Sequence, residues 1–310
     1  MPLRDIVTIG GSAGSIEALK SAVKNLPKDF CAAVFITIHL SPRADSHLAS
    51  VLSRVSPIPV LSARDGQEIS GGKIYVAVPD RHLLVSEDHI HLTRGPKEGL
   101  HRPSINVTFR SAAAAYGSRV VGVLLSGMLD DGASGLWDIA KSNGVVIVQD
   151  PAEAQFPAMP MNALQDVPVN HVSRASEMAS LLIKIVDGCE VPDMPESVRV
   201  PTNGPERLTG FTCPECRGPL YEHRVQPPEF RCRVGHLFPL KTMLEEHTIT
   251  EERKLYEAIV ALEEGADLAE YAAARGDQGD AQLTREAKQL REHAAVVRSL
   301  IEQRVSPSVD

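Results

Sequence analysis

The sequence has 310 residues, which is enough for one α/β domain of ordinary size and an appendage. Its formal net charge of −8 argues against nucleic acid or an anionic membrane surface as the main partner. No apolar stretch is long enough for membrane insertion and residues 1–5 do not resemble a signal peptide, so the expected location is cytoplasmic.

The chain opens with a short strand, a glycine-rich turn and a helix. Residues 6–9 (IVTI) are apolar and mostly β-branched, which predicts a buried strand, and a helical pattern begins at Ser15. The intervening GGSAG (residues 10–14) fits the turn that exposes a nucleophilic serine, here Ser12. The same context also begins phosphate-binding folds, so two interpretations are open at this point.

Strand-like and helix-like segments alternate from residue 5 to about residue 187. Predicted strands cover residues 32–39, 58–61, 73–78, 120–125 and 145–148, and predicted helices cover residues 45–55, 104–116 and 132–143. This alternation predicts the α/β class: a doubly wound, mostly parallel sheet with helices on both faces. Residues 83–93 alternate between apolar and polar instead, which predicts a local antiparallel hairpin.

A nucleophilic Ser12 requires a base and a group that orients the base. His39 ends the second predicted strand, while Asp130 and Asp131 follow the strand at residues 120–125. The carboxyl ends of parallel strands meet at one edge of a sheet, so we expect these groups to converge. Either aspartate could orient the imidazole, the other capping a helix. A dinucleotide site usually has an acid where this chain has His39, so the phosphate interpretation falls behind.

The composition changes after residue 187. We predict a catalytic domain at residues 1–187, a Pro-rich linker at 188–208, a Cys-rich module at 209–245 and an antiparallel helical hairpin at 246–305. Thr248 and Glu251 fit a capping box at the start of the hairpin. Its helices are predicted from two heptad-like stripes, formed by Leu255, Ile259, Leu262, Ala266, Ala269 and Ala273 and by Leu283, Ala287, Leu290, Ala294, Val297 and Ile301.

Three of the five cysteines cluster with a histidine in the module. Cys213, Cys216, Cys232 and His236 follow the spacing C-x2-C-x15-C-x3-H, a Cys₃His set suited to tetrahedral zinc. The segment is too small to be stabilised by a core alone, so a structural zinc is expected. The alternative is a redox pair or a vestigial site.

The segments around Ser12, His39 and Asp131 belong to a longer similarity: residues 5–186 resemble the catalytic domain of the chemotaxis protein-glutamate methylesterases, the CheB family. The matching stretches are IGGSAGS (9–15), ITIHLSP (36–42), HRPSINVTF (101–109), LLSGMLDDGASGL (124–136) and QDPAEAQFPAMPMNAL (149–164). Similar Cys-rich tails with helical hairpins occur in some free-standing members of that family.

The resemblance implies a role for each site residue. It makes Ser12 the nucleophile, His39 the general base, and Asp131 rather than Asp130 the orienting acid. It places the oxyanion and substrate region around Ala13, Met128 and Met159, with donors from the backbone near Met128 and His39. No cofactor is implied for catalysis.

The implied reaction is hydrolysis of glutamyl γ-methyl esters on methyl-accepting chemoreceptors or similar helical signalling proteins, with deamidation of glutamines by the same route. The rival hypotheses are a catalytically weak or inactive signalling adaptor, which binds a partner through the zinc module and hairpin, and an esterase or amidase with another substrate.

The chain departs from the family pattern at Ala13, Ser15 and Leu129, which bears on substrate fit and rate. The family's N-terminal receiver domain is expected to be absent, because the first strand begins within five residues of the start. A separate response regulator is therefore a candidate partner.

Overall fold

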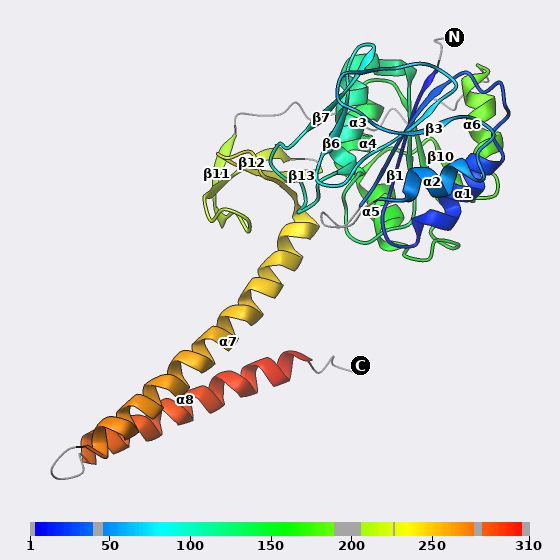
Figure 1. The fold of residues 1–310 in the computed structure, drawn as a ribbon. Helices are drawn as coiled ribbons and strands as arrows, with labels where there is room; N and C mark the ends of the chain where they lie inside the picture. Colours follow the sequence, from blue (N-terminus) through cyan, green and yellow to red (C-terminus); the bar gives the residue numbers. More distant parts are fainter. Residues whose placement is uncertain (1–3, 40–45, 189–205, 226, 276–280, 306–310) are drawn as a thin grey trace. The chain divides into compact units, whose positions relative to one another are not determined.

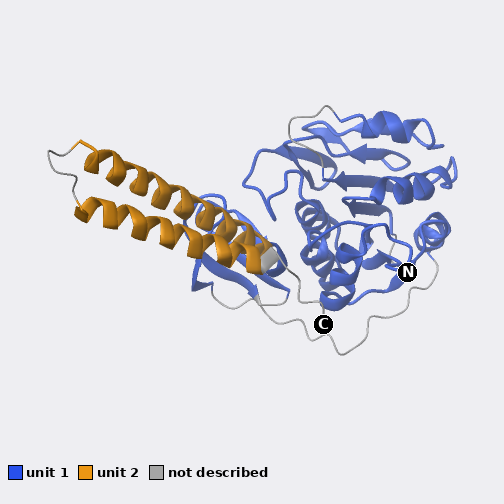
Figure 2. Cartoon of the chain, turned by 90° about the horizontal axis from the view of Figure 1, so that it is seen from below, with its two compact units in different colours: residues 1–242 blue, residues 243–310 orange. Residues whose placement is uncertain are grey.

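The structure is a computed structural model in which residues 4–39, 46–188, 206–225, 227–275 and 281–305 are described. The chain divides into two compact units, residues 1–242 and residues 243–310 (Figure 2). The α/β domain and the Cys-rich module both belong to the first unit. Each unit is described below by itself.

A seven-stranded sheet organises the first unit (Figure 1). Its strands are β1 (Ile6–Gly11), β2 (Ala33–Ile38), β3 (Val60–Ser62), β5 (Ile74–Val76), β8 (Val120–Leu124), β9 (Val145–Gln149) and β10 (His171–Ser173). Their order is β10-β9-β8-β1-β2-β5-β3, and all neighbouring pairs are parallel, as predicted. The chain adds strands on one side of β1 and then returns to β8 on its other side. This reversal of direction makes the β1/β8 edge the topological switch point, where such sheets bind ligands.

Helices cover both faces of the sheet, which confirms the predicted class. One face carries α1 (Ser15–Lys24), α2 (Leu48–Ser53) and α6 (Met178–Val186); the other carries α3 (Ile105–Tyr116), α4 (Ala133–Lys141) and α5 (Ala158–Asp166). Because strand side chains alternate, Val7 and Ile9 enter the first core and Ile6 enters the second. The helix predicted from residue 45 begins at Leu48, and residues 40–45 lie outside the described part of the chain.

Two antiparallel sheets complete the first unit. The predicted hairpin is confirmed by β6 (His82–Val85) and β7 (His89–Thr93), with β4 (Gln67–Glu68) beside β7. The Cys-rich module forms a four-stranded sheet from β11 (Arg207–Thr212), β12 (Pro219–Val225), β13 (Pro228–Cys232) and β14 (Leu237–Pro239). Most of the predicted linker, residues 189–205, lies outside the described residues.

The second unit contains the predicted pair of long helices. Helix α7 (Leu240–Ala273) starts in the first unit, and α8 (Ala281–Val305) runs antiparallel to α7 (Figures 1 and 2). All twelve stripe residues are buried or half-buried, as expected for a helical hairpin. The predicted loop at 276–280 lies outside the described residues.

The predicted capping box at Thr248 is wrong. Helix α7 begins at Leu240, so Thr248 lies inside the helix, where its hydroxyl donates to the Leu244 carbonyl oxygen (3.1 Å). Among the described helices, none combines the length and the apolar character that crossing a bilayer requires.

Candidate active site

Ser12 lies in the tight turn between β1 and α1. Gly14 has φ +72°, a left-handed conformation that glycine adopts without a steric penalty. The Ser12 amide donates to the Ser126 carbonyl oxygen (2.9 Å), which ties the turn to the end of β8. The Ser15 hydroxyl donates to the Ser12 carbonyl oxygen (2.6 Å). The turn is therefore anchored from both sides of Ser12.

Three side chains from adjacent strand ends form a hydrogen-bonded chain. Ser12 Oγ lies 3.1 Å from His39 Nδ1, and His39 Nε2 lies 2.7 Å from Asp131 Oδ2. They follow β1, β2 and β8, which are neighbours in the sheet. A carboxylate only accepts hydrogen bonds, so Nε2 carries the ring proton and Nδ1 accepts from the Ser12 hydroxyl. This is the arrangement that activates a serine nucleophile.

Asp131 is almost fully buried, with 3% of its side chain exposed. Besides His39, it accepts hydrogen bonds from the Ser104 hydroxyl and from the backbone amides of Ile105, Asn106 and Gly132. Burial alone would raise the pKa of Asp131, but the hydrogen bond from His39, together with that from the Ile105 amide, outweighs burial and lowers the pKa to about 2. Asp131 is therefore a carboxylate at neutral pH and fixes the orientation of the imidazole.

Asp130 faces a different set of partners. Its carboxylate accepts hydrogen bonds from the Thr242 hydroxyl (2.7 Å) and the Lys241 amide (3.2 Å) at the start of α7. Burial raises the pKa of Asp130 to about 6, although the Thr242 and Lys241 hydrogen bonds oppose the rise. Of the two aspartates that the sequence left open, Asp131 is the one beside His39.

His101 stacks on His39, a contact that sequence reasoning missed. The two ring centroids are 3.5 Å apart and the rings are inclined by 13°. Burial, and then the neighbouring His39, lower the pKa of His101 to about 4, so His101 is neutral near pH 7. In the sequence, His101 is distinguished only as the first residue of the HRPSINVTF stretch (101–109) that resembles the family.

Gly127 lies between Ser12 and Met159, one of the residues expected around the oxyanion, because a Cβ on Gly127 would meet both side chains. Met128 is exposed over 53% of its surface, whereas Met159 is fully buried. The Met159 sulfur packs where a Cβ on Gly127 would lie, and the Met159 amide donates to the Gly127 carbonyl oxygen (2.9 Å). Met159 therefore packs against Gly127, and Met128 is the residue of this pair that faces solvent.

A second layer of hydrogen bonds holds the peptide after Ser12. The Ser126 hydroxyl donates to the Ala13 carbonyl oxygen (2.9 Å), and the Ser126 amide donates to the buried Gln149 side chain (2.8 Å). The His39 amide, expected near the oxyanion donors, donates to the Gly11 carbonyl oxygen (3.3 Å). The amide groups of Ala13 and Met128 are accordingly the better candidates for oxyanion donors.

Leu129, one of the departures from the family pattern, adopts a left-handed conformation with φ +62°. Such a backbone favours glycine and costs other residues about 1–2 kcal/mol. The Asn162 side chain donates to the Leu129 carbonyl oxygen (2.6 Å) and holds the segment in place.

The four predicted metal ligands converge in the Cys-rich module. The ligand atoms of Cys213, Cys216, Cys232 and His236 all lie within 4.8 Å of one another. His236 Nδ1 is 3.7 Å from Cys213 Sγ and 3.5 Å from Cys232 Sγ, and the Cys216 and Cys232 sulfurs are 3.6 Å apart. Tetrahedral zinc with ordinary bond lengths places such atoms about 3.5–3.8 Å apart. The set therefore fits a metal ion.

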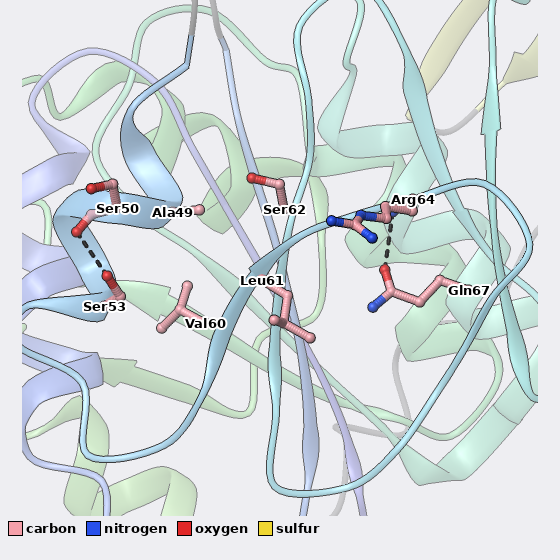
Figure 3. Close-up of a pocket in the computed structure, with 8 residues that line it drawn as sticks. All are labelled: Ala49, Ser50, Ser53, Val60, Leu61, Ser62, Arg64 and Gln67. Atoms are coloured by element: carbon pink, nitrogen blue, oxygen red, sulfur yellow. Dashed lines mark hydrogen bonds between the residues drawn. The ribbon is translucent and has the colours of Figure 1, made fainter.

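A separate hollow of about 570 Å³ lies between α2 and the edge strand β3 (Figure 3). Its lining residues are Ala49, Ser50, Ser53, Val60, Leu61, Ser62, Arg64 and Gln67. It contains none of the predicted site residues.

Comparison with known proteins identifies relatives of the α/β domain. The family model for CheB methylesterase matches residues 7–182. A Leptospira interrogans protein named "Putative protein-glutamate methylesterase/protein-glutamine glutaminase" is 34% identical over 182 residues, which cover 58% of this chain and 94% of that protein. A Methanosarcina mazei protein-glutamate methylesterase/protein-glutamine glutaminase is also 34% identical, over 59% of this chain and 52% of its own length.

Among solved structures, the catalytic domain of Thermotoga maritima CheB methylesterase matches with a TM-score of 0.57 and 31% identity. The match covers 59% of this chain and 98% of that domain. These similarities all concern the α/β domain.

Proposed function

The chain belongs to the CheB methylesterase family, and on this premise we propose that it hydrolyses glutamyl γ-methyl esters with Ser12, His39 and Asp131 as catalytic residues. The observation that carries the proposal is the hydrogen-bonded chain from Ser12 Oγ through His39 to Asp131. The relatives named above carry both methylesterase and glutaminase in their names. The adaptor hypothesis is not favoured.

The proposed reaction is acyl transfer in two steps. Ser12 Oγ attacks the ester carbonyl carbon while His39 Nδ1 takes the hydroxyl proton, and the amides of Ala13 and Met128 stabilise the oxyanion. His39 then gives the proton to the leaving methoxide, and methanol departs. Water, deprotonated by His39, attacks the acyl-serine and releases the glutamate carboxylate. With a glutamine side chain, the same steps release ammonia.

Family members act on chemoreceptors, and we propose that this chain modifies a receptor or a similar helical protein in chemosensory signalling. The hairpin of the second unit is a candidate docking surface, because its outer faces expose large apolar side chains such as Tyr256, Leu268 and Tyr271. A separate response regulator and the cytoplasmic location remain predictions.

We further propose that Cys213, Cys216, Cys232 and His236 hold a structural zinc ion. The ligand distances and the Cys₃His donor set support it. Bound zinc would stabilise the fold of the module, and four protein ligands leave no open position for substrate. The domain boundaries 1–187, 188–208, 209–245 and 246–305 likewise remain proposals.

The test is methanol release from membranes that contain methylated receptors. We expect the wild-type chain to release methanol and Ser12→Ala to release none above background. The matched control is Ser50→Ala, an exposed serine in the hollow of Figure 3, which should behave as wild type. Equal release by the wild type and Ser12→Ala would reject the proposed function.

A further inference from the structure

The Cys-rich module pairs with residues 96–101, a segment that leads into α3 and is called here the 96–101 turn. The Gly99 amide donates to the Leu237 carbonyl oxygen (2.7 Å), and the Leu237 amide donates to the Lys97 carbonyl oxygen (3.4 Å). Leu237 directly follows the ligand His236 in the sequence. The candidate metal ligand His236 therefore directly precedes the short strand β14, which pairs with the 96–101 turn.

The 96–101 turn carries His101 to the catalytic histidine. The His101 amide donates to the Glu98 carbonyl oxygen (3.0 Å), and the Glu98 amide donates to the His101 carbonyl oxygen (3.3 Å). These bonds close the turn, and the His101 ring then lies flat on His39. A continuous series of contacts thus connects the module to the imidazole.

A buried arginine joins the module to α4. Arg224 of β12 is 7% exposed and donates to the Ser134 carbonyl oxygen (3.1 Å) and hydroxyl (2.7 Å) and to Asp138 Oδ1 (2.7 Å). A planar guanidinium can make several such bonds at once. Removing it would leave the partly buried Asp138 without this partner.

The same network reaches the 96–101 turn through acidic side chains. Glu229 of β13 is fully buried. Its Oε2 lies 3.5 Å from Arg224 Nε, and its Oε1 lies 3.5 Å from Arg110 Nη2. Arg110 of α3 in turn donates to both carboxylate oxygens of Glu98 (2.9 and 3.0 Å). The module thus adds a buried carboxylate, Glu229, and a buried guanidinium, Arg224, to the ion pairs that Arg110 makes with Glu98 and Asp138.

From these contacts we propose that the Cys-rich module is a brace for the active site, which holds the 96–101 turn so that His101 keeps the His39 imidazole aligned with Ser12. His101 and Arg224 are positioning residues in this proposal. It rests on the proposed function, because it concerns the rate of the Ser12 reaction. A flat, neutral ring on one face of His39 limits tilting of the imidazole without adding charge beside it.

The kinetic test uses the full chain and p-nitrophenyl acetate, an ester too small to need a docking surface. We expect Arg224→Ala and His101→Ala each to lower kcat about tenfold, with KM nearly unchanged, because a misaligned base slows the chemical step. His101→Phe keeps a flat ring and should recover most of the rate. The double variant Arg224→Ala/His101→Ala should lose no more than the worse single variant, since both act through His39.

The matched control is Arg291→Ala, which removes an arginine that pairs with Asp267 and Glu270 in the second unit. It should leave kcat unchanged. Titration of Ser12 with a fluorophosphonate counts active sites, so that loss of folded protein is separated from slower turnover. Unchanged kcat in Arg224→Ala, or losses that multiply in the double variant, would overturn the proposal.

Hydrogen exchange tests whether the Cys-rich module holds the 96–101 turn, and it does so without measuring activity. After metal removal by a chelator, the amides of Gly99 and His101 should exchange faster, while those of β1 keep their protection. Unchanged protection of Gly99 would overturn the proposal. A wild type without Ser12-dependent turnover would instead reject the proposed function, and the exchange result would still decide whether the module holds the turn.

Discussion

The sheet edge that carries the proposed catalytic residues Ser12, His39 and Asp131, called here the catalytic edge, and the Cys-rich module are stabilised in different ways. Asp131 is fixed by three backbone amides and by a sheet with an apolar core on each face. The described part of the module buries a small apolar set, which includes Leu220, Phe230 and Phe238, beside the Cys₃His cluster and the ion pair of Arg224 with Asp138. The first arrangement follows from the fold itself, whereas the second, with the proposed zinc, would be lost on removal of the metal or of a buried charge.

The largest expected effect concerns the catalytic edge. Ser12→Ala and His39→Ala should each lower kcat on a small ester roughly 10⁴–10⁶-fold, and combining them should cost little more, because these residues act as a unit. Single-turnover kinetics measure this, with circular dichroism to verify the fold. Independent, multiplying losses would contradict a shared mechanism.

The next effect concerns the module. Purified protein should carry about one zinc ion per chain, and chelation should unfold β11–β14, since metal binding of about 10 kcal/mol or more supplies the folding free energy of such segments. Elemental analysis and hydrogen exchange check this, with α1 as the internal control that keeps its protection. A metal-free module with protected amides would show that its apolar set is sufficient.

A third prediction uses the opposite pKa shifts of neighbouring aspartates. Because the pKa of Asp130 is raised to about 6, its protonated carboxyl contributes to the stability of the folded state below about pH 4. This contribution is lost as the pH rises toward 6. The lowered pKa of Asp131, about 2, contributes stability above about pH 4 that is lost as pH falls toward 2.

Asp130→Asn keeps an acceptor for Thr242 but loses the acceptor of the Lys241 amide at every pH, so its stability relative to the wild type should rise by roughly 1–3 kcal/mol between pH 4 and pH 7. Urea unfolding at several pH values measures the difference. Asp29→Asn, at an exposed position, is the control. A constant difference between pH 4 and pH 7 would contradict the assignment.

The catalytic edge was predictable from the sequence, whereas its contacts with the module were not. Ser12, His39 and Asp131 each follow an apolar strand, and parallel strands bring their carboxyl ends together. His101 comes from a turn that pairs with the distant β14, and no local pattern encodes this pairing. Arg224 likewise resembled any polar strand residue, because its buried partners come from another domain.

The start of the helical hairpin was also not predictable from local sequence, because it depends on contacts with a residue that is distant in the chain. The heptad stripes identified both helices, since helical periodicity is a local property. The start of α7 at Leu240 was missed because Asp130, which accepts from the Lys241 amide and the Thr242 hydroxyl there, is remote in sequence.

The smallest expected effect returns to the catalytic edge, at Leu129. Its left-handed backbone costs about 1–2 kcal/mol, and glycine would remove this cost while adding unfolded-state entropy worth about 0.5–1 kcal/mol. Leu129→Gly should therefore raise stability by at most about 1.5 kcal/mol, measured by thermal unfolding. Asn143→Gly is the matched control, because Asn143 has φ +59° and asparagine tolerates this conformation. A destabilised Leu129→Gly variant would mean that the half-buried leucine side chain contributes more through packing than its backbone loses through strain.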